Sequence, residues 1–553
     1  MEATEADYII VGGGLAGCAL ASRIHHGNPS LRVLVIEAGT DPSGNPLVTT
    51  PMGGLTLTGS ELDWAYTSLP QSQTNNRVHT NNAGKVLGGG SVINYGGWSR
   101  GDPADYDEWA RVVGDPRWSY AGLLPFFRRS ESYFDSKADP EKYGFSGPMH
   151  VTSVLASDPN RKYGLRQAIR DAWTELGVKY NPDPSESLSG LSDYLENWRN
   201  GLRQPSTLAY GLGGVQVLTN AMVHRVVFST VDVGQPIASA VLLADGRLIA
   251  ASKEIILSAG TFRTPQILML SGIGPPATLS KHNVPQIYDA PQVGQNLFDH
   301  FAHFQFWKIR NPEKGLAIGS PLWKDPALFK GMPCDWAVNE SIPLHILDPA
   351  VQADNQLASR SGKEYNLSLL HPSRSYVETT ILYAPAGATN LPMNGKYIAS
   401  SVMLCLPTSR GSVTISSASP TDPPVIDSNY YDTNADRVSL IHGTRRILEA
   451  LLNTSAGKAY IETEAAPPGF PVLDTKATDM EIDARIRAAG ISHKHAAGSA
   501  AMGTVLGNDL RVKGVQGLRV VDASILPVPV GGHPQATLYA IAEQAAELIL
   551  QSS

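Results

Sequence analysis

The sequence predicts a mixed α/β fold organised around a nucleotide-binding βαβ unit near the N-terminus. Residues 8–11 form a short apolar run that is typical of a buried parallel strand, and the pattern Gly12-x-Gly14-x-x-Gly17 follows directly. Residues 18–24 suit a helix, residues 32–36 suit a second strand, and Glu37 stands at the end of that strand. With 52 glycines in 553 residues, a glycine pattern alone is weak evidence. Here strand, helix, second strand and terminal acid all occur in the expected order.

Each part of this unit has a physical role in binding a dinucleotide. Gly12 permits the tight turn, Gly14 lets a pyrophosphate approach the backbone, and Gly17 lets the helix pack closely on the strand. The helix N-terminus offers free N–H groups and a partial positive charge to the phosphates. Glu37 can accept hydrogen bonds from a ribose, which favours FAD or NAD over NADP. The alternative is a glycine-rich turn that binds no ligand.

Composition excludes several other classes of protein. A chain of 553 residues predicts two domains or one large interleaved unit. A net charge of −7 argues against nucleic acid as a partner. Three widely spaced cysteines favour reduced thiols over a disulfide framework or a metal site. We see no signal peptide and no apolar run of transmembrane length, so we expect a cytoplasmic protein with no membrane partner.

The remaining elements follow in chain order. We predict helices over residues 105–129, 164–176, 264–271 and 436–452, and a polar surface stretch over residues 130–148. We predict strands over residues 215–218, 223–230 and 254–257, a hairpin of residues 241–243 and 247–250, and an antiparallel pair within residues 398–417. Residues 258–261 form a second junction of strand, glycine and helix, which can face the same dinucleotide. Aromatic residues between 300 and 400 either line a substrate pocket or pack in a core: Phe304, Phe306, Trp307, Trp323, Trp336 and Tyr365.

A second glycine cluster covers residues 84–101 and also carries Ser91 and Asn94. So much glycine suits a backbone that presses against a flat or charged ligand. The alternative is a mobile surface loop, but Val86, Leu87 and Trp98 favour burial.

Of the fourteen histidines, those near the C-terminus suggest chemistry. His300 and His303 have a ligand-like spacing, but no partner motif supports it, so we expect no metal. His495 lies in a His-x-x-Gly-Ser segment, and His533 precedes Pro534.

Five ordered sequence blocks resemble those of the glucose–methanol–choline (GMC) flavoprotein oxidoreductases, and the match spans residues 8–549. The blocks are residues 84–101, 260–275 and 293–300 and the segments around His495 and His533. Five blocks in order are far more specific than any one of them. The histidine pair resembles that of aryl-alcohol oxidases more than that of choline oxidase.

The resemblance implies FAD bound in an extended form. Its pyrophosphate would lie on Gly12, Gly14, Leu15, Ala16 and Gly17, its ribose on Glu37 beside Ala38, and its flavin against Leu87, Gly88, Gly89, Ser91 and Asn94. Val223 would contact the adenine, Asp522 and Ala523 the phosphate and ribityl chain, and Pro534, Gln535 and Thr537 the isoalloxazine ring. Ile93 stands where some relatives carry a histidine bonded to the flavin, so we predict non-covalent FAD. Gly90 departs from the Ser or Cys that is common in the family.

The resemblance and the chemistry agree on catalysis. No side chain can accept a hydride, so the flavin must accept it at N5. An imidazole suits removal of a hydroxyl proton near neutral pH, and we expect His495 to be the general base and His533 its orienting partner, with roles that can be exchanged. For His533 the alternative is a structural residue before a helix. His493 is offset from the family position, and we interpret it as structural rather than catalytic.

These observations predict a Rossmann-like FAD-binding domain interleaved with a substrate domain that is built on an antiparallel sheet flanked by helices. The FAD-binding domain would take residues 1–150, 205–300 and 485–553, and the substrate domain residues 151–204 and 301–484. The predicted reaction is oxidation of a primary, benzylic or allylic alcohol to the aldehyde, with electrons passed to O2 or another acceptor, in a biosynthetic or detoxifying role. The alternatives are a redox-neutral lyase like the hydroxynitrile lyases, which keep FAD as a structural element, and a non-catalytic flavin-binding protein. The substrate and the oligomeric state cannot be read from the sequence.

Overall fold

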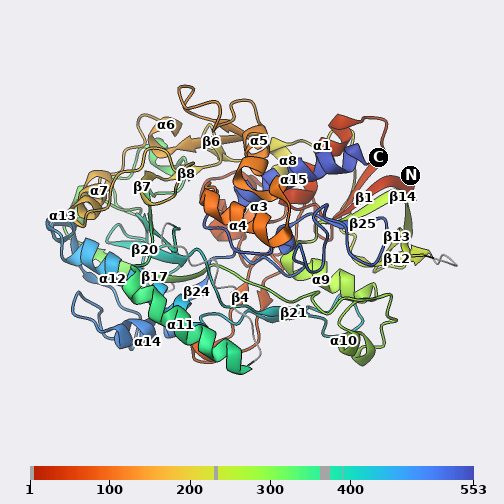
Figure 1. Ribbon diagram of the computed structural model, residues 1–553. Coiled ribbons are helices and arrows are strands. Elements are labelled where there is room, and N and C mark those ends of the chain that lie inside the picture. The colour runs from red at the N-terminus through yellow and green to blue at the C-terminus, as the bar shows by residue number, and fades with distance from the viewer. Residues whose placement is uncertain (1–4, 230–233, 362–373, 389, 553) are drawn as a thin grey trace.

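The N-terminal apolar strand lies inside a seven-stranded sheet in the computed structural model, which describes residues 5–229, 234–361, 374–388 and 390–552 (Figure 1). The strand order is β11-β2-β1-β14-β13-β12, and β25 pairs with β14. The strands are β1 (Glu5–Val11), β2 (Val33–Ile36), β11 (Gln216–Leu218), β12 (Val223–Ser229), β13 (Ile237–Leu243), β14 (Leu248–Leu257) and β25 (Leu518–Val520). β11, β2, β1, β14 and β25 run parallel, whereas β12 and β13 form an antiparallel edge. The parallel strands read as continuous apolar runs because both of their faces are covered.

The predicted hairpin is confirmed, with Val241 paired to Ile249. Its second strand does not end at residue 250, however, but continues to Leu257 as one strand, β14. The first part of β14 pairs with β13, and almost its whole length pairs with β1.

Helices from both ends of the chain cover this sheet. α1 (Leu15–Gly27) packs against α15 (Pro534–Gln551), and α15 packs against α5 (Tyr120–Ser130). Figure 1 shows the two termini on the same side of the molecule. The first and last segments of the sequence therefore form one unit.

A second seven-stranded sheet, entirely antiparallel, lies in the other half of the molecule (Figure 1). Its order is β23-β17-β20-β19-β18-β7, and β24 pairs with β17. The strands are β7 (Gly190–Asp193), β17 (Phe301–Ile309), β18 (Trp336–Glu340), β19 (Val377–Leu382), β20 (Tyr397–Leu404), β23 (Ile461–Glu464) and β24 (Ile491–Ser492). α12 (Asn434–Leu452) packs on β19 and β20, and α7 (Arg166–Glu175), α11 (Leu344–Ser361), α13 (Ser455–Tyr460) and α14 (Asp479–Ala489) surround it.

The α/β fold class is therefore confirmed, with a parallel-rich sheet and a helix-flanked antiparallel sheet formed by interleaved segments. The domain boundaries proposed from the sequence stay a prediction. β24 belongs to the second sheet although the prediction placed residues 485–553 in the FAD-binding domain.

Residues 105–129 are mostly helical, as predicted, and form two helices, α4 (Pro103–Val113) and α5, because Gly114 adopts a left-handed φ of 72° and ends the first of them. Two other local predictions are wrong. The stretch 130–148 is not uniformly surface, since Glu131 is buried against Arg100. The two strands within residues 398–417 do not pair with each other: β20 joins the second sheet, and β21 (Ser412–Thr414) pairs with β22 (Val425–Asp427).

Short elements complete the description. The helices are α2 (Gly53–Leu57), α3 (Gly90–Ile93), α6 (Val154–Ser157), α8 (Ser206–Ala209), α9 (Gly260–Leu270) and α10 (Pro276–Lys281). The strands are β3 (Tyr66–Thr67), β4 (Thr80–Asn81), β5 (Glu131–Tyr133), β6 (Met149–Ser153), β8 (Leu195–Glu196), β9 (Trp198–Arg199), β10 (Leu202–Arg203), β15 (Ile273–Gly274) and β16 (Tyr288–Asp289). Cys18, Cys334 and Cys405 are all buried free thiols. Among the helices that the structure describes, none combines the length and the hydropathy needed to cross a membrane.

Candidate active site

The glycine-rich turn between β1 and α1 requires glycine at two positions. Gly12 has a φ of +101°, and a Cβ atom there would lie 2.4 Å from the carbonyl oxygen of Ser258. A Cβ atom at Gly17 would lie 2.1 Å from the carbonyl oxygen of Gly12. Both contacts are with backbone atoms, so only glycine lets α1 start this close to β1 and β14.

The second glycine cluster closes on the first. The N–H of Gly88 donates to the carbonyl of Gly13 at 2.6 Å, and a Cβ atom at Gly89 would lie 2.6 Å from Cα of Gly14. The cluster is therefore packed against the turn rather than exposed as a mobile loop. The packed glycines form one wall, and the backbone N–H groups of this wall can donate hydrogen bonds to a ligand.

A cavity of about 240 Å³ opens at this wall. Most of the residues predicted to bind FAD line it: Gly12, Gly14, Leu15, Ala16, Glu37, Ala38, Gly89, Val223, Asp522, Ala523 and Pro534. The second strand–glycine–helix junction, residues 258–261, also lines it, as does His495. Trp64 and Tyr66, whose rings stack 5.5 Å apart, line it too, and no pattern in the sequence had indicated them.

The other residues predicted to bind FAD do not line the cavity but contact residues around it. Gly17, Leu87 and Gly88 pack on the turn, and the Ser91 hydroxyl donates to the carbonyl of Gly88 at 2.6 Å. Asn94 donates to Gln535 at 3.4 Å, and Thr537 bonds to Tyr106 at 2.8 Å.

Glu37 and Asp522 are the acids of the cavity. The Glu37 carboxylate accepts the N–H groups of Gly13 and Gly39 at 2.9 and 2.7 Å. Burial raises the pKa of Glu37 to about 7, although these N–H groups act in the opposite direction. Asp522 accepts from the N–H of Gly260 and the hydroxyl of Thr264, and burial raises its pKa as well. Carboxylates that line a glycine-rich cavity can accept hydrogen bonds from hydroxyl groups, as on the ribose and the ribityl chain of FAD.

His495 and His533 meet at the inner end of this cavity. Their ring centroids lie 5.2 Å apart. His495 follows β24, and its backbone N–H donates to Asp299 at 2.8 Å. His533 is the residue before α15, and its backbone N–H donates to the Ser99 hydroxyl at 2.8 Å. The two sequence-predicted catalytic residues are therefore neighbours in space.

Two further histidines surround the pair. His300 Nδ1 lies 3.0 Å from His495 Nδ1 in a hydrogen bond. The ring of His493 lies 4.9 Å from that of His495 and 5.8 Å from that of His533. His303, which shares the spacing noted in the sequence, points elsewhere and bonds to Thr444.

Of the aromatic residues between 300 and 400, one packs against the histidine cluster and others lie in the hydrophobic core of the second sheet. Phe304 stacks against His493 with ring centroids 6.1 Å apart. Trp307, Trp323 and Trp336 are buried in the core of the second sheet, and Tyr365 lies outside the described residues.

The two catalytic candidates have opposite protonation preferences. Burial, together with the neighbouring histidines, lowers the pKa of His495 well below its usual value. Burial also acts against the charged form of His533, but the Glu378 carboxylate, 2.8 Å from His533 Nε2, outweighs it and raises the pKa of His533. The surroundings therefore favour the neutral form of His495 and the charged form of His533.

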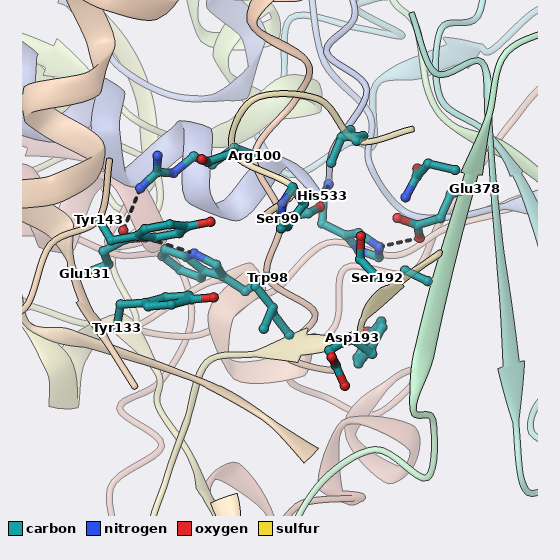
Figure 2. Close-up of a pocket in the computed structure, with 17 residues that line it drawn as sticks. Trp98, Ser99, Arg100, Glu131, Tyr133, Tyr143, Ser192, Asp193, Glu378 and His533 are labelled. Atoms are coloured by element: carbon teal, nitrogen blue, oxygen red, sulfur yellow. Dashed lines mark hydrogen bonds and ion pairs between the residues drawn. The ribbon is translucent and has the colours of Figure 1, made fainter. Parts of the chain in front are cut away.

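Glu378 was missed at the sequence level because a single acid in a β-strand carries no motif. It lies on β19, and its cross-strand neighbour on β18 is Asn339. Together with Ser192 and His533, both residues line a separate cavity of about 50 Å³ (Figure 2). Ser192 Oγ and Asn339 Oδ1 are buried and make no hydrogen bond within the described part of the chain. These two unpartnered polar atoms suit ordered water beside the Glu378–His533 pair, although much of the cavity lining is apolar.

Comparison with known proteins agrees with this geometry. The family model described as GMC oxidoreductase matches residues 6–302 with its N-terminal part and residues 407–542 with its C-terminal part. The GMC-type oxidoreductase acuG of Aspergillus aculeatus is 41% identical over 549 residues, covering 98% of this chain and 99% of that protein.

Two solved structures have the same fold. Formate oxidase of Aspergillus oryzae, studied for modification of its FAD, superposes with a TM-score of 0.85 at 26% identity, covering 100% of this chain and 99% of that chain. A fungal aryl-alcohol oxidase gives a TM-score of 0.80 at 26% identity and covers 99% of both chains.

Proposed function

The chain belongs to the GMC oxidoreductase family, with FAD as its cofactor, and we propose that it oxidises a primary, benzylic or allylic alcohol to the aldehyde. The observation that carries the proposal is the placement of His495 and His533. His495 lines the FAD-binding cavity, and the ring of His533 lies 5.2 Å from the ring of His495. A base and a hydrogen-bond donor at that position match what an alcohol needs in order to lose both a proton and a hydride.

The residues that would hold FAD are those of the glycine-lined cavity. The Gly12–Gly17 turn and the start of α1 would hold the pyrophosphate, Glu37 the ribose and Pro534 the flavin end. When bound there, FAD supplies the hydride acceptor that no side chain can replace.

The hydroxyl proton of the alcohol would go to a side chain and not to FAD. Since His495 Nδ1 faces His300, its Nε2 is the nitrogen that would take the hydroxyl proton of the alcohol. The charged His533 would donate a hydrogen bond to the alcohol oxygen, and Glu378 fixes the orientation of that ring. The structure thus favours His495 as the base, a choice that the sequence had left open.

The test is an anaerobic titration of the yellow holoenzyme with aryl, allylic and aliphatic alcohols, followed by air. We expect an alcohol to abolish the absorption band of oxidised flavin with formation of one equivalent of aldehyde. Rapid recovery in air with peroxide would indicate an oxidase, and slow recovery another electron acceptor. Product formed with the flavin band unchanged would contradict the proposal and favour the redox-neutral lyase.

A further inference from the structure

Three imidazole rings in the active site have the arrangement of a transition-metal site. The ligand nitrogens of His493, His495 and His533 all lie within 4.8 Å of one another. Zinc–nitrogen bonds of about 2.0–2.1 Å hold tetrahedral ligands about 3.3 Å apart, so side-chain movements of about 1 Å complete the geometry. His300 and His303, whose spacing in the sequence gave no reason to expect a metal, bond to different partners, His495 and Thr444.

We propose that His493, His495 and His533 bind one Zn²⁺ or Cu²⁺ ion in the enzyme without substrate, and that this ion excludes the alcohol. Binding of the ion is independent of the proposed function. The competition with alcohol rests on it.

The neighbours of two of these rings are those of a metal-binding histidine. The Nε2 of His533 is bonded to the Glu378 carboxylate at 2.8 Å, which leaves Nδ1 as the nitrogen that would bind the ion. Carboxylate–histidine–metal arrangements of this kind fix the ring and increase its basicity as a ligand. His300 holds Nδ1 of His495 at 3.0 Å in the same way and leaves Nε2 for the ion.

The local charges tolerate a dication. The Glu378 carboxylate is bonded to the His533 ring, and the Asp299 carboxylate accepts the backbone N–H of His495. Lys494 acts against a cation, since its charge lowers the pKa of His493 and His495, but it is exposed and its ammonium group bonds to the Tyr95 hydroxyl at 3.1 Å. No arginine contact to the three rings is found among the described residues.

The donor set determines the class of ion. Three imidazole nitrogens suit Zn²⁺, Cu²⁺ and Ni²⁺, whereas Ca²⁺ and Mg²⁺ require oxygen ligands. The ion must displace the proton that Glu378 favours on His533, so its binding weakens as the pH falls. Three protein ligands also leave a fourth position open for water. The ion would also occupy the ring nitrogens of His495 and His533 that the proposed mechanism gives to the alcohol, so ion and alcohol compete for the same two imidazoles.

The first experiment measures binding alone. Tag-free holoenzyme is titrated with Zn²⁺ by calorimetry, and with Co²⁺ as a spectroscopic probe of tetrahedral coordination. We expect one ion per chain. His493→Gln should weaken binding at least tenfold, whereas His345→Gln, the same change at an exposed histidine outside the cluster, should bind as the unaltered protein does. The absence of saturable one-to-one binding, or equal affinity in His493→Gln, would overturn the proposal.

The second experiment tests the competition. We expect Zn²⁺ to raise the KM for an alcohol without changing kcat, and EDTA to restore the original KM. A fall in kcat at constant KM would show that the ion lies elsewhere. If no alcohol proves to be a substrate, the calorimetric result still decides the metal site, so failure of the proposed function is distinguishable from failure of this inference.

Discussion

At the scale of single residues, the Glu378 carboxylate gives His533 a preferred protonation state different from that of His495. His495 and His533 are neighbours, but only His533 has its ring bonded to a carboxylate, whereas Asp299 bonds to the backbone of His495. We expect His495→Ala to lower kcat/KM by about 10²–10⁴-fold, the usual contribution of a general base. FAD content, measured from the visible spectrum, should be unchanged. A loss below tenfold would show that another group takes the proton.

We expect Glu378 to set the alkaline limit of activity. Its ion pair raises the pKa of His533, so the charged donor persists to higher pH and is lost as the pH rises through that raised value. Glu378→Gln removes the charge, and the alkaline limb of the kcat/KM profile should move to lower pH. Ser192→Ala, a neutral change in the same cavity, should leave the limb in place. An unmoved limb in Glu378→Gln would mean that His533 does not act as a charged donor.

The isoleucine at position 93 indicates that FAD is bound non-covalently. It is a buried residue of α3 and has no nucleophilic atom to bond to the flavin. Acid precipitation should release all yellow chromophore into the supernatant. A yellow pellet would show a covalent bond at another residue.

Residues with a role in a motif were predictable, and those positioned only by the fold were not. Gly12, Gly17 and Glu37 have fixed spacing, so their structural roles follow from the sequence. Glu378 and His300 reach His533 and His495 through strand pairing in the second sheet and the entry to β17, and nothing local in the sequence indicates either contact.

At the scale of elements, the β1–α1 junction is the least tolerant of change. Gly17→Ala would place a methyl group 2.1 Å from the carbonyl oxygen of Gly12, an atom of the backbone that cannot move aside. We expect a loss of about 1–3 kcal/mol of stability, with weaker FAD binding. Thermal denaturation and flavin content would measure both. Gly213→Ala, where the added Cβ meets open space, is the matched control and should change neither.

Element prediction failed where strand partners came from far away. The helical prediction for residues 105–129 is confirmed, and the structure adds that Gly114 divides the segment into two helices. β20 and β21 are adjacent in sequence, but each finds a better partner elsewhere: β20 pairs with β17 and β19, and β21 with β22. Local sequence carries no information about such distant partners.

At the scale of the whole molecule, FAD is expected to act as a structural link. The walls of its cavity come from the N-terminal turn, from β12, from α9 and from the segments around His495 and Asp522. A ligand at about 1,000 times its dissociation constant stabilises the folded state by about 4 kcal/mol. The apoprotein should therefore melt several degrees below the holoprotein, and added FAD should restore the higher value. Equal melting temperatures would show that the cavity is stable without its ligand.

The parallel sheet also constrains the order of events during synthesis. β1 and β2 leave the ribosome first, but β25 and α15, which complete the same sheet and cover α1, are made last. The apolar surfaces of β14 and α1 therefore stay exposed to solvent until β25 and α15 have been synthesised, which takes more than 200 further residues of chain. We expect the nascent protein to depend on chaperones during that interval. A ribosome that stalls anywhere before residue 518 would release a chain that cannot close its nucleotide-binding half.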